Sequence, residues 1–332
     1  MKKVLWLAMG GTVAMTRNSK TGALVPTHSV DKLYEVLPEI KQIADIEFCD
    51  IENIDSTNVK PAHWVKLLEK IEENYEKFDG FVVTHGTDTM TFSASGLSFM
   101  TRDLGKPIIF TGAQLPLADA ITDAHQNLLH SFKFATEDVG EVAICFGNKL
   151  IRGNRAQKRS EFSWEAFESV NVPPIGEYGL SPKLFAHRIR RDHTRKTTFV
   201  SDFENKIHIL HLYPGIQSAI FDMLVDTGIK GIVINAFGAG NIPGDLIPAI
   251  QNAIKKGVSI VVTTQCDLGA AEMFLYEVGL EAQKNASVSG LDMTLEAAYA
   301  KLQVVLAKTD DPKKIKKLMQ SDFAGELTED IF

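Results

Sequence analysis

The sequence has few cysteines. Only three occur among 332 residues, Cys49, Cys145 and Cys266, and they are far apart, with no C-x-x-C pair. An odd number of isolated cysteines supports neither a disulfide framework nor a structural zinc site, and it is typical of a reducing compartment. A cytoplasmic location is therefore expected.

Long apolar runs are also lacking. No stretch approaches the roughly 18 apolar residues of a transmembrane helix, so no membrane association is expected. The apolar run near the N-terminus, Val4–Met9, is shorter than the core of a signal peptide, and it ends at Gly10-Gly11 without a cleavage motif. We interpret this run as a first buried strand.

An excess of positive charge is absent as well. The formal net charge is -7, and 23% of the residues are charged, as in ordinary globular proteins. Nucleic-acid binding normally requires clustered positive charge, so no nucleic-acid partner is expected. The one basic stretch, residues 187–196, is interpreted as a solvated linker.

Several cofactor and catalytic signatures are missing. Gly10-Gly11 do not complete the dinucleotide fingerprint G-x-G-x-x-G, no P-loop occurs, and no serine-hydrolase elbow G-x-S-x-G is present. His208 and His211, three residues apart in an expected strand, face opposite sides and cannot share one ion. Asp123 is expected to cap the helix that follows it. We therefore expect neither a cofactor nor a metal.

What the sequence does contain is a series of short apolar runs, each followed by glycine or polar residues and then by a helical pattern. Continuous hydrophobicity indicates strands covered on both faces, as in a parallel sheet. Residues 61–78 place Trp64, Leu67, Leu68 and Ile71 on one helical face. Residues 93–105 and 123–138 show the same helical pattern. The alternation predicts a doubly wound α/β fold. The expected strands are Val4–Met9, Asp45–Cys49, Phe81–Thr84, Pro107–Phe110, Val142–Phe146, Ile207–Leu212, Gly231–Asn235 and Ser259–Thr263.

The length of the chain favours two domains. A polar segment, "TTFVSDFENK", ends just before a fresh series of strands begins at Ile207. We therefore expect a larger N-terminal catalytic α/β domain over residues 1–188, with a mainly parallel sheet flanked by helices. A linker over residues 189–206 and a smaller C-terminal α/β domain with a parallel sheet over residues 207–332 complete the predicted organisation.

Polar side chains collect where the expected strands end, which is the edge at which α/β sheets bind ligands. These residues are Thr12 after the first strand, Asp55, Ser56 and Thr57 after the strand Asp45–Cys49, and Thr87 and Asp88 after the strand Phe81–Thr84. Glycine-flanked turns at the same positions could supply an oxyanion hole. Helix capping by the same residue types is the competing explanation for any one turn.

Threonine chemistry needs an activating group, because a hydroxyl is a poor nucleophile until a base removes its proton. Lys158, in "RGNRAQK" after the fourth strand, is the candidate, since a desolvated lysine can accept a proton. Asp88, beside Thr87, could orient this lysine or hold a substrate ammonium group.

The motifs "MGGTVAM", "HGTDTM", "DSTN", "TGAQLPLADAITDAHQNLL", "RGNRAQKRSEFSWEAFES" and "AFGAGNIP" resemble those of the bacterial-type L-asparaginase family. The resemblance runs over effectively the whole chain and is strongest for the cytoplasmic, type I branch. It implies hydrolysis of the side-chain amide of L-asparagine to L-aspartate and ammonia, through a threonine nucleophile and an acyl-enzyme intermediate. Some branches carry an extra N-terminal domain for a tRNA-dependent amidotransferase, a role not expected here because the catalytic domain begins at Met1.

The resemblance also implies roles for individual residues. Thr12 attacks the amide carbon, and Thr87 forms a second cluster with Asp88 and Lys158. Asn241, in "AFGAGNIP", reaches the site from a neighbouring subunit, so a homodimer or homotetramer is expected. The implied substrate contacts are Gly11, Asp55, Ser56, Thr57, Ala113 and Asn241.

Two departures from the family pattern leave alternatives open. Residues 16–29 contain no tyrosine, although many members use one near the first threonine. Cys266, in "TTQC", resembles part of an allosteric asparagine site, but Gln157 and Asn235 stand where threonine and arginine are expected. A broader amidohydrolase that accepts glutamine or D-asparagine is one alternative, and a weakly catalytic amino-acid-binding protein is the other.

Overall fold

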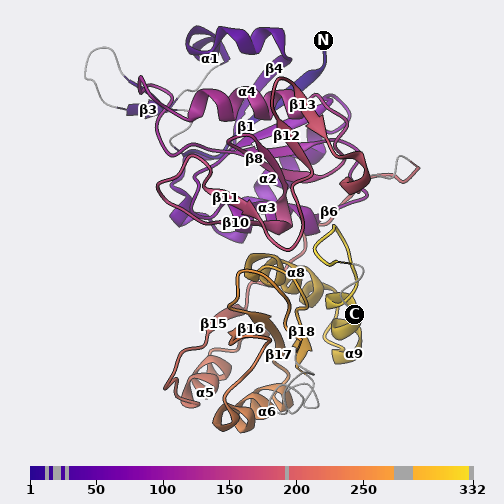
Figure 1. Ribbon diagram of the computed structural model, residues 1–332. Helices are drawn as coiled ribbons and strands as arrows, with labels where there is room; N and C mark the ends of the chain where they lie inside the picture. The colour runs from indigo at the N-terminus through magenta and orange to yellow at the C-terminus, as the bar shows by residue number, and fades with distance from the viewer. Residues whose placement is uncertain (12–14, 18–23, 27–29, 191–193, 273–286, 329–332) are drawn as a thin grey trace. The chain divides into compact units, whose positions relative to one another are not determined.

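The computed structural model describes residues 1–11, 15–17, 24–26, 30–190, 194–272 and 287–328 (Figure 1). The chain divides into two compact units, Met1–Ser201 and Asp202–Phe332. None of the described helices is both long enough and apolar enough to span a membrane.

The first unit is built on an eight-stranded sheet with the order β13-β12-β9-β8-β7-β5-β1-β4. Five neighbouring strands, from β8 to β4, are parallel, and β9, β12 and β13 add antiparallel pairs at one edge. The predicted α/β class with a mainly parallel sheet is confirmed. The bounds are β1 Lys3–Ala8, β4 Asp45–Asp50, β5 Gly80–Thr84, β7 Ile108–Thr111, β8 Val142–Phe146, β9 Lys149–Arg152, β12 Gly176–Tyr178 and β13 Pro182–Leu184.

Helices cover both faces of this sheet because successive strand side chains point to opposite sides. Trp6 packs against Phe132 of α4, with ring centroids 6.4 Å apart, whereas Phe81 stacks on Tyr75 beside the end of α2, at 6.0 Å. All five residues of β5 are buried, as continuous hydrophobicity predicts. The helices of this unit are α1 Val30–Val36, η2 Pro38–Gln42, η3 Ser56–Asn58, α2 Pro61–Asn74, α3 Met90–Met100, α4 Ala124–Phe134, η4 Gly153–Arg155 and η5 Ala186–Arg188.

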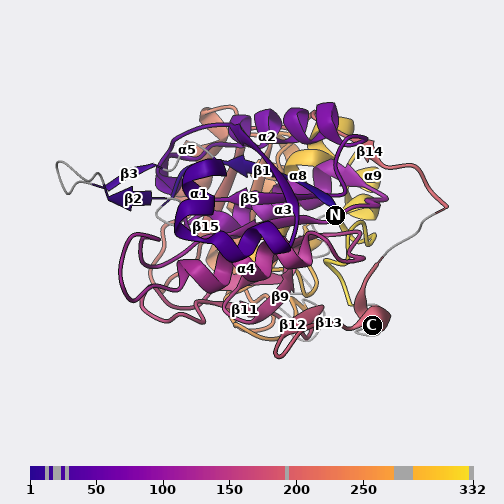
Figure 2. The same ribbon diagram turned by 90° about the horizontal axis from the view of Figure 1, so that it is seen from above.

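Three small strand pairs lie outside the main sheet. They are β2 Met15–Arg17 with β3 Leu24–Pro26, β10 Ala156–Lys158 with β11 Phe167–Ser169, and β6 Thr101–Arg102 with β14 Thr198–Phe199. Figure 2 shows β2 and β3 extending away from the sheet. The β6–β14 pair ends α3 and fastens part of the segment expected as a linker to the first unit.

The basic stretch 187–196, expected to be a solvated linker, is exposed at His187 and Arg190, and it makes tertiary contacts through Arg188 and Arg190. The Arg188 guanidinium donates to the Pro174 carbonyl at 2.9 Å and lies 4.4 Å from the centre of the Phe185 ring. The Arg190 N–H donates to the Glu141 carboxylate at 2.6 Å. The contacts with Pro174 and Glu141 are long-range in sequence, so composition alone could not predict them.

The second unit has a four-stranded parallel sheet with the order β15-β16-β17-β18. Helices α5 and α6 pack together, and α8 packs on strands β15 to β17. The predicted smaller α/β unit with a parallel sheet is confirmed. The bounds are β15 Ile207–His211, α5 Ala219–Asp226, β16 Gly231–Ala236, η6 Gly244–Leu246, α6 Ile247–Lys255, β17 Ser259–Thr264, β18 Val288–Ser289, α8 Leu295–Lys308 and α9 Pro312–Met319.

A fully buried ion pair joins α8 to the segment that follows α9. The Lys301 ammonium lies 2.6 Å from the Glu326 carboxylate, and both side chains are 0% exposed. Lys301 also donates to the carbonyls of Met319 at 2.8 Å and Ser321 at 2.6 Å. Backbone N–H groups of residues 323 and 324 donate to Glu326, so both buried charges have polar partners, as their desolvation requires.

Candidate active site

A pocket of ≈ 270 Å³ opens where β4, β1, β5 and β7 end. These four strands are neighbours in the sheet, so the turns that follow them meet at its carboxyl edge. The pocket is lined by Gly11, Asn53, Ile54, Asp55, Ser56, Gly86, Thr87, Asp88, Ala113 and Gln114.

Glycines allow the turns to approach one another closely. Gly11 has φ +87°, and a Cβ there would lie 2.7 Å from the Gly86 nitrogen. A Cβ on Gly86 would in turn lie 2.6 Å from the Ser56 Oγ. Because real Cβ atoms do not come so close to other atoms, only glycine fits at these two positions.

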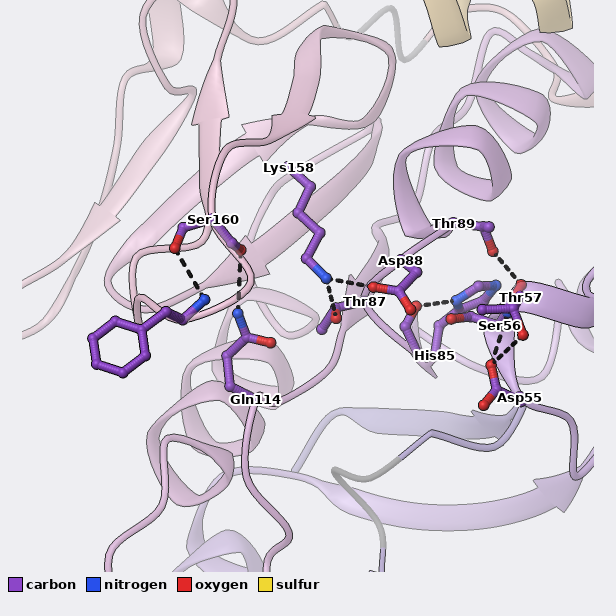
Figure 3. Close-up of polar contacts among 12 residues, drawn as sticks. Asp55, Ser56, Thr57, His85, Thr87, Asp88, Thr89, Gln114, Lys158 and Ser160 are labelled. Atoms are coloured by element: carbon purple, nitrogen blue, oxygen red, sulfur yellow. Dashed lines mark hydrogen bonds and ion pairs between the residues drawn. The ribbon is translucent and has the colours of Figure 1, made fainter.

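Lys158 contacts the two residues that follow β5. Its ammonium donates to the Thr87 hydroxyl at 2.9 Å and to the Asp88 carboxylate at 2.5 Å (Figure 3). The Lys158 side chain is 17% exposed, whereas that of Asp88 is 58% exposed. A hydroxyl and a carboxylate that both contact one lysine are the groups needed to move a proton on and off a nucleophile.

The turn after β4 presents a second carboxylate. Asp55 accepts from the Thr57 N–H at 2.9 Å and from the Thr57 hydroxyl at 2.8 Å (Figure 3). These bonds favour the ionised form and hold the pKa of Asp55 below its ordinary value of 3.8. The Thr89 hydroxyl donates to the Ser56 carbonyl at 2.7 Å and so joins this turn to the start of α3.

The structure brings most of the predicted site residues together. Gly11, Asp55, Ser56, Thr87, Asp88 and Ala113 line the pocket, Lys158 contacts Thr87 and Asp88, and Thr57 is bound to Asp55. Thr12 lies outside the described residues. Asn241 lies in the second unit, where its N–H donates to the Phe237 carbonyl at 2.7 Å. The functional roles predicted for these residues remain predictions.

Sequence reasoning missed four lining residues, Asn53, Ile54, Gly86 and Gln114. All four lie within two positions of a predicted residue in the chain, so extending each polar turn by two positions would have found them. Gln114 follows Ala113, and its side-chain amide points across to the segment after Lys158, where it donates to the Ser160 carbonyl at 3.3 Å (Figure 3).

The expectation that Asp123 caps the following helix through its side chain is wrong. Its carboxylate instead accepts from the Gln114 N–H at 3.0 Å, the Leu115 N–H at 3.1 Å and the Asn127 amide at 3.1 Å. Asp123 is 4% exposed. Because its carboxylate binds the N–H groups of Gln114 and Leu115, it holds the turn that forms one wall of the pocket. The helix N–H of Ala124 is bound by the Thr122 hydroxyl at 3.0 Å.

Capping does not explain the polar residues after β5 either. Thr89 is the residue before α3, but it makes no side-chain cap and its hydroxyl donates to Ser56. Thr84 accepts from the Trp6 indole at 3.0 Å. The interpretation of His85 as a structural hydrogen-bonding residue is confirmed, because its ring contacts the Gly86 carbonyl at 2.7 Å and the Ser93 hydroxyl at 2.9 Å.

Metal ligands do not gather in the described part of the chain, where no three His, Cys, Asp or Glu side chains lie close enough to hold an ion. The buried thiol of Cys145, within β8, is disfavoured as a ligand or nucleophile, since burial raises the pKa of Cys145 to about 12.

Comparison with known families agrees with this geometry. Residues 3–190 match the family model "Asparaginase, N-terminal", and residues 206–319 match "Glutaminase/Asparaginase C-terminal domain". The chain belongs to the asparaginase family. The predicted resemblance, including its type I branch, is confirmed.

Relatives within the asparaginase family carry two different names. The chain is 36% identical to a subunit of the glutamyl-tRNA(Gln) amidotransferase of Pyrococcus horikoshii, in a match that covers 97% of this chain and 76% of that protein. It is 33% identical to L-asparaginase 1 of Escherichia coli K12, with 99% of each chain covered. The solved structure of a thermostable L-asparaginase from Thermococcus kodakarensis superposes with a TM-score of 0.92 at 31% identity, over 98% of this chain and 99% of that one.

Proposed function

We propose that this asparaginase-family protein is an L-asparaginase, which hydrolyses L-asparagine to L-aspartate and ammonia. The observation that carries the proposal is the contact of Lys158 with Thr87 and Asp88 at the edge of the pocket. A threonine hydroxyl beside a lysine suits acyl transfer from an amide, because the lysine can accept and return the hydroxyl proton.

The size and charge of the pocket favour a free amino acid. A volume of ≈ 270 Å³ lies below the roughly 300–1,000 Å³ of pockets for drug-sized ligands. Asp55 and Asp88 line this space, and either carboxylate can pair with an α-ammonium group. We assign the grip on the substrate to Asp55, Ser56 and Thr57, with Asp88 as the ammonium partner and Gly11 and Ala113 as further contacts.

The proposed reaction proceeds in two stages. The hydroxyl of Thr12 or Thr87 adds to the amide carbon, its proton passes by way of Lys158 to the leaving nitrogen, and the C–N bond then breaks to release ammonia. Water next adds to the acyl-enzyme ester, and cleavage of the C–O bond releases aspartate and restores the hydroxyl. Asp88 stabilises the ammonium form of Lys158 between these steps by its opposite charge. This scheme uses no cofactor.

We further propose a cytoplasmic homodimer or homotetramer in which Asn241 completes the site of a neighbouring subunit. A second candidate function comes from the relatives whose names describe a component of glutamyl-tRNA(Gln) amidotransferase. In that case the same site would release ammonia for use by a partner protein bound to charged tRNA. The two candidates differ in whether the isolated chain turns over free asparagine.

The test is steady-state ammonia release by the purified chain from L-asparagine, L-glutamine and D-asparagine. We expect L-asparagine to be the best substrate, and both Thr12→Ala and Thr87→Val to lose roughly a thousandfold or more in kcat. Thr227→Val is the matched control, because the Thr227 hydroxyl donates to the Leu224 carbonyl in the second unit. Absence of ammonia with all three amides would reject the asparaginase assignment, and ammonia release only with charged tRNA and a partner would establish the amidotransferase role.

A further inference from the structure

A chain of three hydrogen bonds leads to the pocket from the buried side of the first unit. The Trp64 indole N–H, on α2, donates to the Ser93 hydroxyl of α3 at 2.9 Å. Ser93 contacts the His85 Nε2 at 2.9 Å, and the His85 Nδ1 contacts the Gly86 carbonyl at 2.7 Å. We call these four residues the Trp64–Gly86 relay. Figure 3 shows the His85 ring beside the turn that carries Thr87 and Asp88.

The carbonyl end of the relay and a neutral ring together fix its protons. An indole nitrogen can only donate, and a backbone carbonyl can only accept. His85 therefore carries a proton on Nδ1 and donates it to the Gly86 carbonyl. On a neutral ring Nε2 can then only accept, so Ser93 donates to Nε2 and accepts from Trp64. The ring is neutral, since its 1% exposure disfavours the imidazolium form and lowers the pKa of His85 to about 4.

Packing holds the donor end of the relay in place. Trp64 is buried, and its ring lies on Gly96 of α3, where a Cβ would come within 2.6 Å of the ring atom Cε3. Ser93 is buried one turn before Gly96 on the same helix. The close contact of α2 with α3 at this point holds the Trp64 indole and the backbone of Ser93 in place, and the bond from the indole orients the Ser93 hydroxyl.

The acceptor end of the relay, the Gly86 carbonyl, lies where the backbone is most free to rotate. Gly86 has no side chain, and a glycine rotates its following peptide at little steric cost. Rotation of the Gly86–Thr87 peptide would carry the Thr87 hydroxyl away from Lys158. The bond from His85 opposes this rotation, and it also polarises the peptide group that forms part of the pocket wall.

We propose that His85 is a positioning residue that locks the Gly86–Thr87 peptide through its Nδ1–H and thereby holds the Thr87 hydroxyl against Lys158. This assignment rests on the proposed function for its effect on turnover. The direction of the relay does not depend on any activity, so it can be tested separately.

The first experiment is ¹⁵N NMR of the wild-type protein labelled at histidine, with the His85 signal assigned by its loss in His85→Asn. We expect a neutral ring protonated on Nδ1 at neutral pH. A ring protonated on Nε2, or one that is charged at neutral pH, would overturn the proposal. If the protein releases no ammonia, the proposed function fails. The NMR result still tests the direction of the hydrogen bonds in the relay, because it does not depend on activity.

The second experiment compares two replacements of His85. The amide nitrogen of asparagine stands the same number of bonds from Cα as Nδ1, so His85→Asn can still donate to the Gly86 carbonyl. The amide oxygen of glutamine matches the reach of Nε2 and can accept from the Ser93 hydroxyl, so His85→Gln keeps the contact with Ser93 and loses the one with Gly86. Thermal unfolding of both variants shows how much stability each one loses.

We expect kcat to fall about tenfold to a hundredfold in His85→Gln, with a smaller change in KM. The free energy lost when one buried hydrogen bond is left unmade is comparable to the rise in activation free energy that such a fall in kcat requires. His85→Asn should keep kcat within about threefold of the wild type at equal or lower stability. Equal losses of kcat in the two variants, or a loss that follows thermal stability alone, would show that His85 is merely structural.

Discussion

Replacement of Lys301 by methionine should destabilise the second unit strongly. In the wild type the ammonium is bound by the Met319 and Ser321 carbonyls and by Glu326, and it lies 4.6 Å from the centre of the Phe323 ring. Methionine retains the apolar stem, so little volume is lost. The variant instead leaves a carboxylate and two carbonyls without their cation in a site that water does not reach.

The expected cost follows from those unpaired groups. Removal of one member of a buried ion pair costs about 3–5 kcal/mol, and a buried carbonyl left unsatisfied costs about 1–3 kcal/mol. These costs overlap because Glu326 retains its backbone donors, so we expect about 4 kcal/mol at neutral pH. The double variant Lys301→Met with Glu326→Gln should recover at least about half of it, since no unpaired charge remains.

The loss should also depend on pH. Burial raises the pKa of Glu326, but the Lys301 charge and the backbone donors outweigh it and hold the pKa below its ordinary value of 4.5. A carboxyl with a lowered pKa stabilises the fold above the pKa of the unfolded chain and loses that contribution as the pH falls through the folded value. The free energy of unfolding of the wild type should therefore fall in acid, and the difference in this free energy between the wild type and Lys301→Met should become smaller.

The measurement should report on the second unit alone. All three tryptophans, Trp6, Trp64 and Trp164, lie in the first unit, so indole fluorescence does not serve. Native-state hydrogen exchange of peptides from α8 and α9 in rising urea gives the local free energy of opening. A Lys301→Met protein within about 1 kcal/mol of the wild type, or a double variant as unstable as the single one, would contradict the role given to the pair.

Other predictions concern the pocket. Lys158→Met should lower kcat by at least about a hundredfold with a smaller change in KM, and Lys158→Arg should fail as well, because arginine keeps the charge but does not accept a proton; near-normal ammonia release by either variant would exclude the lysine as the proton acceptor. Gly86→Ala should abolish binding measured by calorimetry, since its Cβ would lie 2.6 Å from the Ser56 Oγ; wild-type affinity would show that the turns can separate. If Asp55 grips the substrate, KM should stay flat from neutral pH down to about pH 4, because hydrogen bonds from Thr57 keep the pKa of Asp55 low; a rise in KM near neutral pH would point to another group. Dialysis against a chelator should leave turnover unchanged, and activity that returns only with added metal would overturn the cofactor-free scheme.

The central strands were predictable because burial on both faces demands continuous hydrophobicity. Val142–Phe146 was predicted with the bounds that β8 has, and Gly231–Asn235 falls one residue short of β16. The short strands β12 and β18 were missed. Two or three residues carry no detectable period, and β12 is fixed by pairing with β9 and β13 rather than by its own sequence.

The candidate site was predictable only in part. Thr87 and Asp88 stood out because polar residues directly follow an apolar strand. Their contact with Lys158 does not follow from strand order, because Lys158 ends β10, which pairs with β11 outside the main sheet. The true partners of Asp123 could not be predicted, because its carboxylate turns back to N–H groups eight and nine residues earlier. Local propensity predicts a helix cap at such a residue, and here tertiary contacts override it.

The pocket joins turns that follow β1, β4, β5 and β7, so its lining runs from Gly11 to Gln114 in the chain. These turns become neighbours only when the strands have taken their order in the sheet. A ligand that binds there recognises the assembled sheet and has no complete site on a partly folded chain. Binding of a ligand therefore shifts the folding equilibrium of the first unit toward the native state by mass action. The stability of this unit against unfolding then depends on the concentration of the ligand.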